Sequence, residues 1–237
     1  MRSIMRMIPV LALCFACLLG LAACSGGQAA SSSAAASSSG EAASPSVEAS
    51  SQAAVEPSSA SMETVPTDQM AIGQKALVAY YSATGNTALV AGMIAEDIDA
   101  TVLAIEPEEP YTAEDLDYNN EASRVAQEHN DPNLQQVALM NAEVPDWDTY
   151  DTVFIGYPIW WGEAAWPVAS FVAANDFSGK NVVPFCTSAS SGLGSSAQGL
   201  QQLAGTGYWA EGMRFSSEPT QEEVNSWIQS FILDTNQ

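Results

Sequence analysis

The chain has 237 residues, and its 28 acidic residues outnumber its 6 lysines and arginines, so its formal net charge is −22 at pH 7. Nucleic-acid binding needs a basic face, which six cations cannot supply, and the same charge disfavours docking on anionic lipid. Three of the four cysteines lie within the first 24 residues, which excludes a disulfide framework. The charge suits a soluble domain whose macromolecular partners are basic.

Residues 1–23 have the pattern of an export signal. Two arginines stand in the first six residues, and an apolar run follows that ends in small residues before Cys24. The Leu-Ala-Ala-Cys sequence at residues 21–24 resembles a bacterial lipobox. This resemblance implies that the chain is cut before Cys24, that Cys24 carries lipid, and that the protein is extracytoplasmic and anchored to the cell membrane. An ordinary signal peptide or an uncleaved N-terminal anchor is the alternative.

A linker is expected over residues 24–73. Residues 25–60 contain 13 Ser and 11 Ala and no aromatic residue, so this segment cannot bury enough apolar surface to offset its chain entropy. It would serve as a disordered tether for the lipid-anchored domain or as a mere spacer. The folded domain is expected over residues 74–237.

From residue 74 the pattern changes to strands that alternate with helices. This alternation predicts one α/β domain, a doubly wound five-stranded parallel sheet with helices on both faces. Strands are expected at residues 76–81, 101–105, 152–157, 181–186 and 208–213, and helices at residues 87–97, 114–130, 164–174, 195–204 and 220–233.

A polar loop, Ser-Ala-Thr-Gly-Asn-Thr at residues 82–87, joins the first strand to the first helix. The unpaired amides and positive dipole of a helix N-terminus favour a phosphate. No Lys or Arg lies between Lys75 and Arg124, so a phosphate here would be held by neutral donors. The loop lacks the lysine of a P-loop and the three glycines of a dinucleotide fingerprint. As a bare pattern, it is equally a strand–helix turn with a Thr N-cap.

The loop resembles the phosphate loop of flavodoxins, Ser/Thr-x-Thr-Gly-x-Thr, in both sequence and position. The chain from about residue 75 to 234 resembles a flavodoxin-like domain throughout. This resemblance implies a strand order of 2-1-3-4-5 and noncovalently bound FMN. It also implies that the FMN phosphate is bound by Ser82, Ala83, Thr84, Gly85, Asn86 and Thr87.

A second stretch, Gly-Tyr-Pro-Ile-Trp-Trp-Gly-Glu at residues 156–163, follows the third strand. Neighbouring side chains cannot both point inward, and an indole offers a flat face for a flavin ring. The stretch resembles the flavodoxin loop in which an aromatic residue covers the inner flavin face, and its spacing leaves open which tryptophan does so. Gly162 is the candidate for a peptide that turns to bond the flavin N5. The residues implied at the ring are Pro158, Ile159, Trp160, Trp161 and Gly162.

A third stretch, residues 185–195, is rich in Ser and Gly and follows the fourth strand. The resemblance implies that its amides line the N1/O2 edge of the flavin. No aromatic residue is present to cover the outer ring face, which favours a substrate or partner that stacks there. The residues implied here are Thr187, Ser188, Ser190 and Gly192.

Other candidates for chemistry are weaker. His129 is the only histidine and has no Cys or carboxylate cluster at ligand spacing, so no metal site is expected. Cys186 at a strand end is expected to be a small core residue. Tyr111 and Tyr118 would either lie over the ligand or cap the second helix.

Two functions from different classes fit these patterns. The first is an FMN-binding lipoprotein that carries electrons or reduces a small acceptor such as a quinone, with a basic redox partner protein or a small molecule as its partner. The second is a non-redox surface lipoprotein that binds another phosphate-bearing ligand in the same loop. Neither assigns a catalytic residue or an oligomeric state.

Overall fold

The computed structural model describes residues 64–233, with side chains described up to residue 231. The expected signal segment, Cys24 and most of the expected linker lie outside the described residues. Within the described part, no helix is long and apolar enough to span a bilayer.

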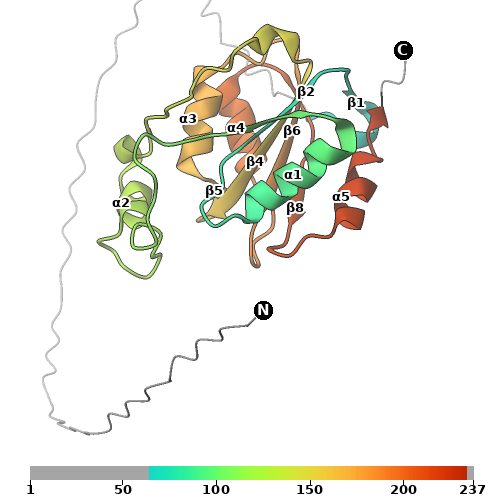
Figure 1. The fold of residues 1–237 in the computed structure, drawn as a ribbon. Helices are drawn as coiled ribbons and strands as arrows, with labels where there is room; N and C mark the ends of the chain where they lie inside the picture. The colour runs from blue at the N-terminus through green and yellow to red at the C-terminus, as the bar shows by residue number, and fades with distance from the viewer. Residues whose placement is uncertain (1–63, 234–237) are drawn as a thin grey trace, which may run out of the picture. The chain divides into compact units, whose positions relative to one another are not determined.

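The centre of the domain is a parallel sheet with the strand order β3-β2-β4-β6-β7 (Figure 1). Its strands are β3 (Thr101–Ala104), β2 (Ala76–Tyr80), β4 (Thr152–Trp160), β6 (Asn181–Thr187) and β7 (Tyr208–Trp209). In chain order this is 2-1-3-4-5, so the doubly wound prediction is confirmed.

Two short strands bring the sheet to seven strands instead of the five predicted. β5 (Glu163–Ala164) pairs antiparallel with β4, and β8 (Met213–Phe215) pairs parallel with β6. The expected fifth strand is therefore split into β7 and β8. Pro184 lies on β6 between the residues that pair with β7 and those that pair with β8, and it has no amide N–H to donate.

Helices cover both faces of the sheet, and each face has its own core (Figure 1). α1 (Asn86–Ile98) and α5 (Gln221–Ile228) bury apolar side chains against Val78 and Phe154. α3 (Trp166–Ala174) and α4 (Ser196–Ala204) bury theirs against the other face, together with Val125 of α2 (Arg124–Asn130). The strands are buried on both sides, as their continuous apolar runs predict.

The prediction of a helix over residues 114–130 is wrong in its first half, because α2 begins only at Arg124. The side chains of Asp117 and Asn120 accept hydrogen bonds from backbone amides two residues further along the chain. Such local bonds compete with helix formation. Ser123 then caps α2 by accepting from the Ala126 amide at 3.3 Å.

The domain begins earlier than residue 74, which corrects the expected boundary. Met70 and Ile72 are buried in the core on the α1/α5 face. β1 (Ala71–Ile72) pairs in parallel with β9 (Ile232–Leu233), where the last predicted helix was expected to continue. The Val65 amide also donates to the Trp209 carbonyl at 2.7 Å. Residues from about 64 onward therefore belong to the folded domain.

Candidate functional site

Three loops meet at the carboxyl edge of β2, β4 and β6. The register pairs Tyr80 with Gly156 and Pro158 with Thr187, so the three strands end side by side. The hydroxyls of Thr87 and Thr187 lie 2.8 Å apart, which joins the first loop to the third. A Cβ added to Gly194 would lie 3.9 Å from the Gly162 carbonyl oxygen, so the third loop also reaches the second.

The first loop, residues 82–87, ends in the first turn of α1, whose first two residues are Asn86 and Thr87. Gly85 is the N-cap residue at φ 94°, a left-handed conformation that disfavours a side chain. Its amide donates to the Ser82 hydroxyl at 3.1 Å, and the Asn86 side chain donates to the Thr84 hydroxyl at 3.3 Å. The first amides of α1 have no acceptor within the helix, so they are available to an anion.

Thr87 differs from the other hydroxyl residues of this loop because it is buried. Its hydroxyl and that of Thr187, which is also buried, form a hydrogen bond in which either can donate. The sequence implied a direct role for Thr87 at a phosphate. The structure places its hydroxyl where it also fixes the distance between α1 and the end of β6.

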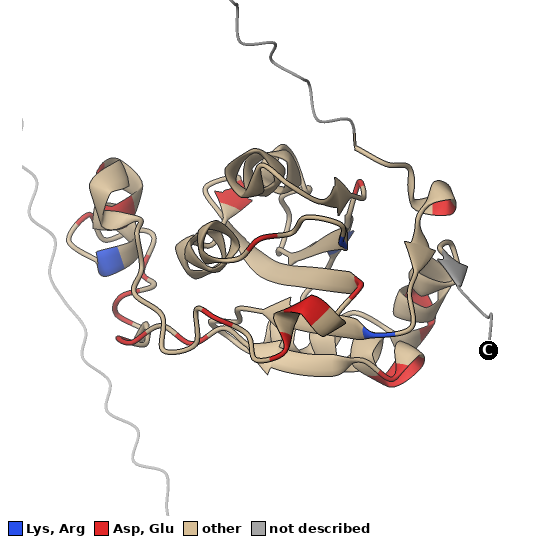
Figure 2. Ribbon diagram, turned by 90° about the horizontal axis from the view of Figure 1, so that it is seen from above, with Lys and Arg blue, Asp and Glu red and all other residues tan. Residues whose placement is uncertain are grey.

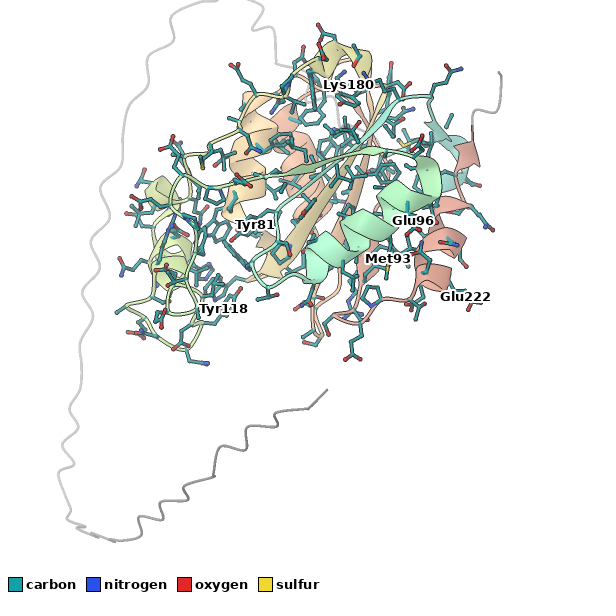
Figure 3. The ribbon with its side chains drawn as sticks, viewed as in Figure 1. Tyr81, Met93, Glu96, Tyr118, Lys180 and Glu222 are labelled. Atoms are coloured by element: carbon teal, nitrogen blue, oxygen red, sulfur yellow. The ribbon has the colours of Figure 1, made fainter. Side chains whose placement is uncertain are left out.

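No cation accompanies the first loop within residues 64–231. Lys75 directly precedes β2, and its ammonium donates to the Thr149 hydroxyl. Lys180 directly precedes β6 and donates to the carbonyls of residues 147 and 150; Figure 3 labels it at the end of the sheet away from Tyr81. Arg124 pairs with Glu128, and Arg214 holds the third loop. Figure 2 shows acidic residues on most elements and few basic ones. A phosphate at this loop would therefore meet only neutral donors and the helix dipole.

The second stretch is a tight hairpin instead of the loop expected after residue 157. β4 continues to Trp160, so Pro158 and Ile159 are strand residues. Trp160 pairs with Glu163 of β5, which leaves Trp161 and Gly162 as a two-residue turn. Their φ values are 47° and 85°, the left-handed signs that a type I′ turn requires.

The two neighbouring tryptophans point to opposite sides. Trp160 is 1% exposed and packs edge-on against Tyr81, Tyr111 and Trp166, with ring centroids 5.1 to 6.0 Å apart. Trp161 is 38% exposed. The structure therefore makes Trp160 a core residue, which corrects its place among the ring-binding residues. Trp161 is the indole that can offer a face to a ligand.

Trp161 contacts two residues that precede β4 by many positions. Its ring stacks on His129 of α2 with centroids 4.4 Å apart and planes 5° apart. The ring centroid of Tyr118, which Figure 3 labels, lies 4.8 Å from that of Trp161, with the ring planes tilted by 55°. Partial burial raises the pKa of Tyr118, which stays 47% exposed, to about 12. The sequence did not predict the contact of His129 with Trp161, because no local pattern signals a contact across 32 positions.

Glu128 anchors α2 to the aromatic core. This buried carboxylate accepts from Arg124 Nε at 2.8 Å and from the Tyr111 hydroxyl at 2.7 Å. The Arg124 guanidinium also lies 3.9 Å from the centre of the Tyr111 ring. Burial and the bond to Glu128 raise the pKa of Tyr111 above its usual value. Tyr111 thus belongs to the packing around Trp160, whereas Tyr118 lies beside Trp161.

Arg214 of β8 holds the third loop, and sequence reasoning missed it as well. Its guanidinium donates to the Ser188 hydroxyl at 3.1 Å and to the carbonyls of Ser188 and Ala189 at 2.6 and 3.1 Å. The Ser188 hydroxyl also donates to the Ser191 carbonyl. Ser190 and Gly192 are exposed. The loop is therefore fixed through its carbonyls while its middle faces solvent.

Cys186 is fully buried just before this loop, as expected. Burial raises the pKa of its thiol to about 12, so it is not a nucleophile at neutral pH. Among residues 64–231, no group of three or more His, Cys, Asp or Glu side chains could hold a metal ion.

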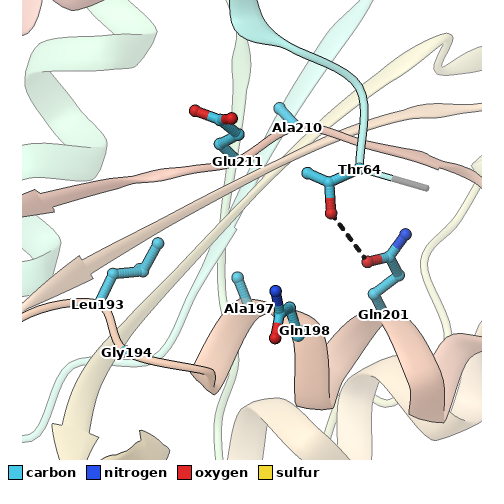
Figure 4. Close-up of a pocket in the computed structure, with 8 residues that line it drawn as sticks. All are labelled: Thr64, Leu193, Gly194, Ala197, Gln198, Gln201, Ala210 and Glu211. Carbon is cyan, nitrogen blue, oxygen red and sulfur yellow. Dashed lines mark hydrogen bonds between the residues drawn. The ribbon is translucent and has the colours of Figure 1, made fainter. Parts of the chain in front are cut away.

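Two of the pockets in the described part of the chain border the first or the third loop. One of about 580 Å³ lies between residues 81–85 and the segment after β3, with Tyr111 and Met140 in its walls. The other, of about 260 Å³, lies between the third loop and α4 (Figure 4). Thr64 bonds Gln201 across it at 3.4 Å. Its lining contains no aromatic residue and no residue of the first loop, so it is not a ring site.

The comparisons with known proteins agree with this geometry. The Flavodoxin family model matches residues 75–231. The solved structure of a proposed flavoprotein from Bacteroides uniformis is 39% identical, with a TM-score of 0.62, and the match covers 66% of this chain and 99% of that one. A second proposed flavoprotein, from Bacteroides eggerthii, is 37% identical, with a TM-score of 0.59 and coverage of 65% and 96%. No curated protein matches the chain.

Proposed function

The chain belongs to the flavodoxin family, and from that premise we propose that its three loops bind FMN noncovalently, for electron transfer or for reduction of a small acceptor such as a quinone. The observation that carries the proposal is the joining of residues 82–87, the Trp161–Gly162 turn and residues 187–195 at one sheet edge. Ligands of doubly wound sheets bind at the carboxyl ends of the strands.

The first loop fits the phosphate of FMN. The α1 amides and the hydroxyls of Ser82 and Thr84 are neutral donors next to a positive helix end, which suits a phosphate dianion. Thr84 and Gly85 are exposed, and nothing lies within 4 Å of a Cβ built on Gly85. The loop is therefore open to a phosphate.

The second and third loops fit the flavin ring. Trp161 offers indole surface for stacking, and the third loop offers backbone amides to the ring edge. Gly162 has φ 85°, and nothing lies within 4 Å of a Cβ built on it, so its peptide has room to turn toward the ring. These residues position the ring, whereas bound FMN supplies the redox chemistry.

The acidity of the chain supports a role in electron transfer. With a net charge of −22, the protein opposes additional negative charge on a reduced ring and so lowers its reduction potential. The same charge attracts a redox partner protein with a basic face. The third loop carries no aromatic residue over residues 187–195, which leaves one ring face for a flat acceptor.

We place this activity outside the cytoplasm, on a lipid-anchored protein. The lipobox-like sequence that ends in Cys24 supports this location, and the Ser/Ala-rich segment after it supports a tether. The second candidate function is a non-redox lipoprotein that binds another phosphate-bearing ligand. Neutral donors at a helix end can donate to any phosphomonoester, which supports it.

A titration of the purified chain separates the two functions. FMN fluorescence should be quenched on binding, and Thr84→Ala with Thr87→Ala should weaken FMN far more than riboflavin, which lacks the phosphate. Equal losses for both ligands would contradict the assigned phosphate site. If FMN fluorescence stays unchanged at tens of micromolar, the redox function is refuted and the binding function stands.

A further inference from the structure

Trp161 occupies a backbone conformation that its side chain disfavours. A type I′ turn needs positive φ at both central positions, which Gly162 adopts freely and a bulky residue does not. The ring is 38% exposed, so core packing does not account for a tryptophan here. Strained residues persist where surrounding contacts determine them, and they cluster at functional sites.

The contact that determines the ring's orientation comes from α2. His129 lies parallel to the indole, 4.4 Å between centroids and 5° between planes, whereas Tyr118 meets it at a tilt. His129 itself is held in place, because its neighbour Glu128 is buried and bonded to Arg124 and Tyr111. An exposed stack therefore rests on a rigid support.

The hairpin lies between α2 and the third loop. α2 reaches it at the Trp161 ring, and the third loop reaches it at the Gly162 carbonyl. In Figure 1, α2 stands to one side of the sheet, away from the turns that follow β6. A ring bound between the hairpin and the third loop would approach the Trp161–Gly162 turn from the side of the third loop.

We propose that His129 is a positioning residue that backs Trp161 from the α2 side and holds the indole ready to stack on the flavin ring. This inference rests on the proposed FMN site. It assigns no contact between His129 and the ligand. It predicts that loss of the His129 ring leaves the binding of the FMN phosphate unchanged. Only the stacking of Trp161 on the flavin ring should weaken, because only the indole becomes free to rotate.

Three variants of the full chain test this role. His129→Ala should weaken FMN and riboflavin by the same factor, about two- to tenfold, which is the range of one aromatic pair. It should also change the visible circular dichroism of the bound flavin. His129→Phe should restore affinity, because it restores a flat ring. Asn130→Ala, an exposed change on the same helix, is the matched control and should have no effect.

Affinity that is unchanged in His129→Ala would overturn the proposal. Tighter binding would overturn it too, since His129 would then occupy the face that the flavin needs. A loss of affinity for FMN but not for riboflavin would show that His129 acts on the phosphate loop and not on the indole, which also contradicts the proposal. If the unaltered chain does not bind FMN, the proposed function fails; if it binds and only the His129 outcomes differ, the function stands and this inference fails.

Discussion

The hydroxyl pair that joins the first and third loops allows a sharp test of the site. Thr87 and Thr187 are 1% and 4% exposed, and their oxygens lie 2.8 Å apart. Replacing either threonine with valine keeps the shape and leaves the other hydroxyl buried without its partner. Such an orphaned group costs about 1–3 kcal/mol of folding stability.

The double replacement distinguishes the loss of the Thr87–Thr187 hydrogen bond from the cost of leaving one buried hydroxyl unpaired. With both hydroxyls gone, no polar group is left unpaired, and such paired replacements are nearly neutral. Thr87→Val with Thr187→Val should therefore recover most of the stability that either single change loses. The coupling energy between the two sites is then close in size to the sum of the two single losses and opposite to it in sign.

Urea unfolding of the four proteins without ligand measures these free energies. FMN and riboflavin titrations of the same four proteins then show whether the Thr87 hydroxyl also contacts the phosphate. If it does, the double variant should be stable and should bind FMN more weakly, while its affinity for riboflavin stays unchanged. A double variant whose instability equals the sum of the two singles would refute the link between the loops.

Other predictions follow from burial and exposure. Trp160→Ala should lower the free energy of unfolding by about 3–5 kcal/mol, as expected for a large aromatic residue removed from a core. Trp161→Ala should leave urea unfolding nearly unchanged while lowering the affinity for FMN and riboflavin alike. The reverse result for the two variants would make Trp161 the core residue and Trp160 the ligand contact. Cys186 should resist alkylation in the native chain at mildly alkaline pH and react once guanidinium unfolds it, as read from the mass of its peptide. Cys24→Ala should abolish incorporation of labelled fatty acid in cells, and continued labelling would place the lipid elsewhere.

The half-exposed phenol of Tyr118 predicts how stability depends on pH. Partial burial beside Trp161 raises the pKa of Tyr118 to about 12, above the ordinary 10 of an unfolded tyrosine. The folded state therefore favours the protonated form, and this contribution is complete below pH 10 and is lost as the pH rises toward 12. Tyr118→Phe should make that decline in urea unfolding shallower between pH 10 and 12, while Tyr81, Tyr111 and Tyr157, whose pKa values are also raised, keep contributing to it. An identical decline in both proteins would contradict the assignment.

Much of the fold could be read from the chain because its signals are local. Apolar runs such as residues 76–80 mark strands buried on both faces, and their alternation with helices implies the parallel order that the structure confirms. The errors lie where local side-chain bonds compete with the expected element. Asp117 and Asn120 divert a predicted helix into turns, and Pro184 divides the last strand's pairing.

The candidate site divides in the same way. Residues 82–87 form one contiguous loop, so their neutral donors and the helix N-terminus were predictable from sequence alone. Adjacent positions also implied that the two neighbouring tryptophans could not both face inward. Which one does so, and that His129 supports it, depended on where β4 ends and where α2 packs. Contacts across 26 to 100 positions, such as Arg214 with Ser188 and Thr87 with Thr187, exist only because parallel strands bring distant loops to one edge.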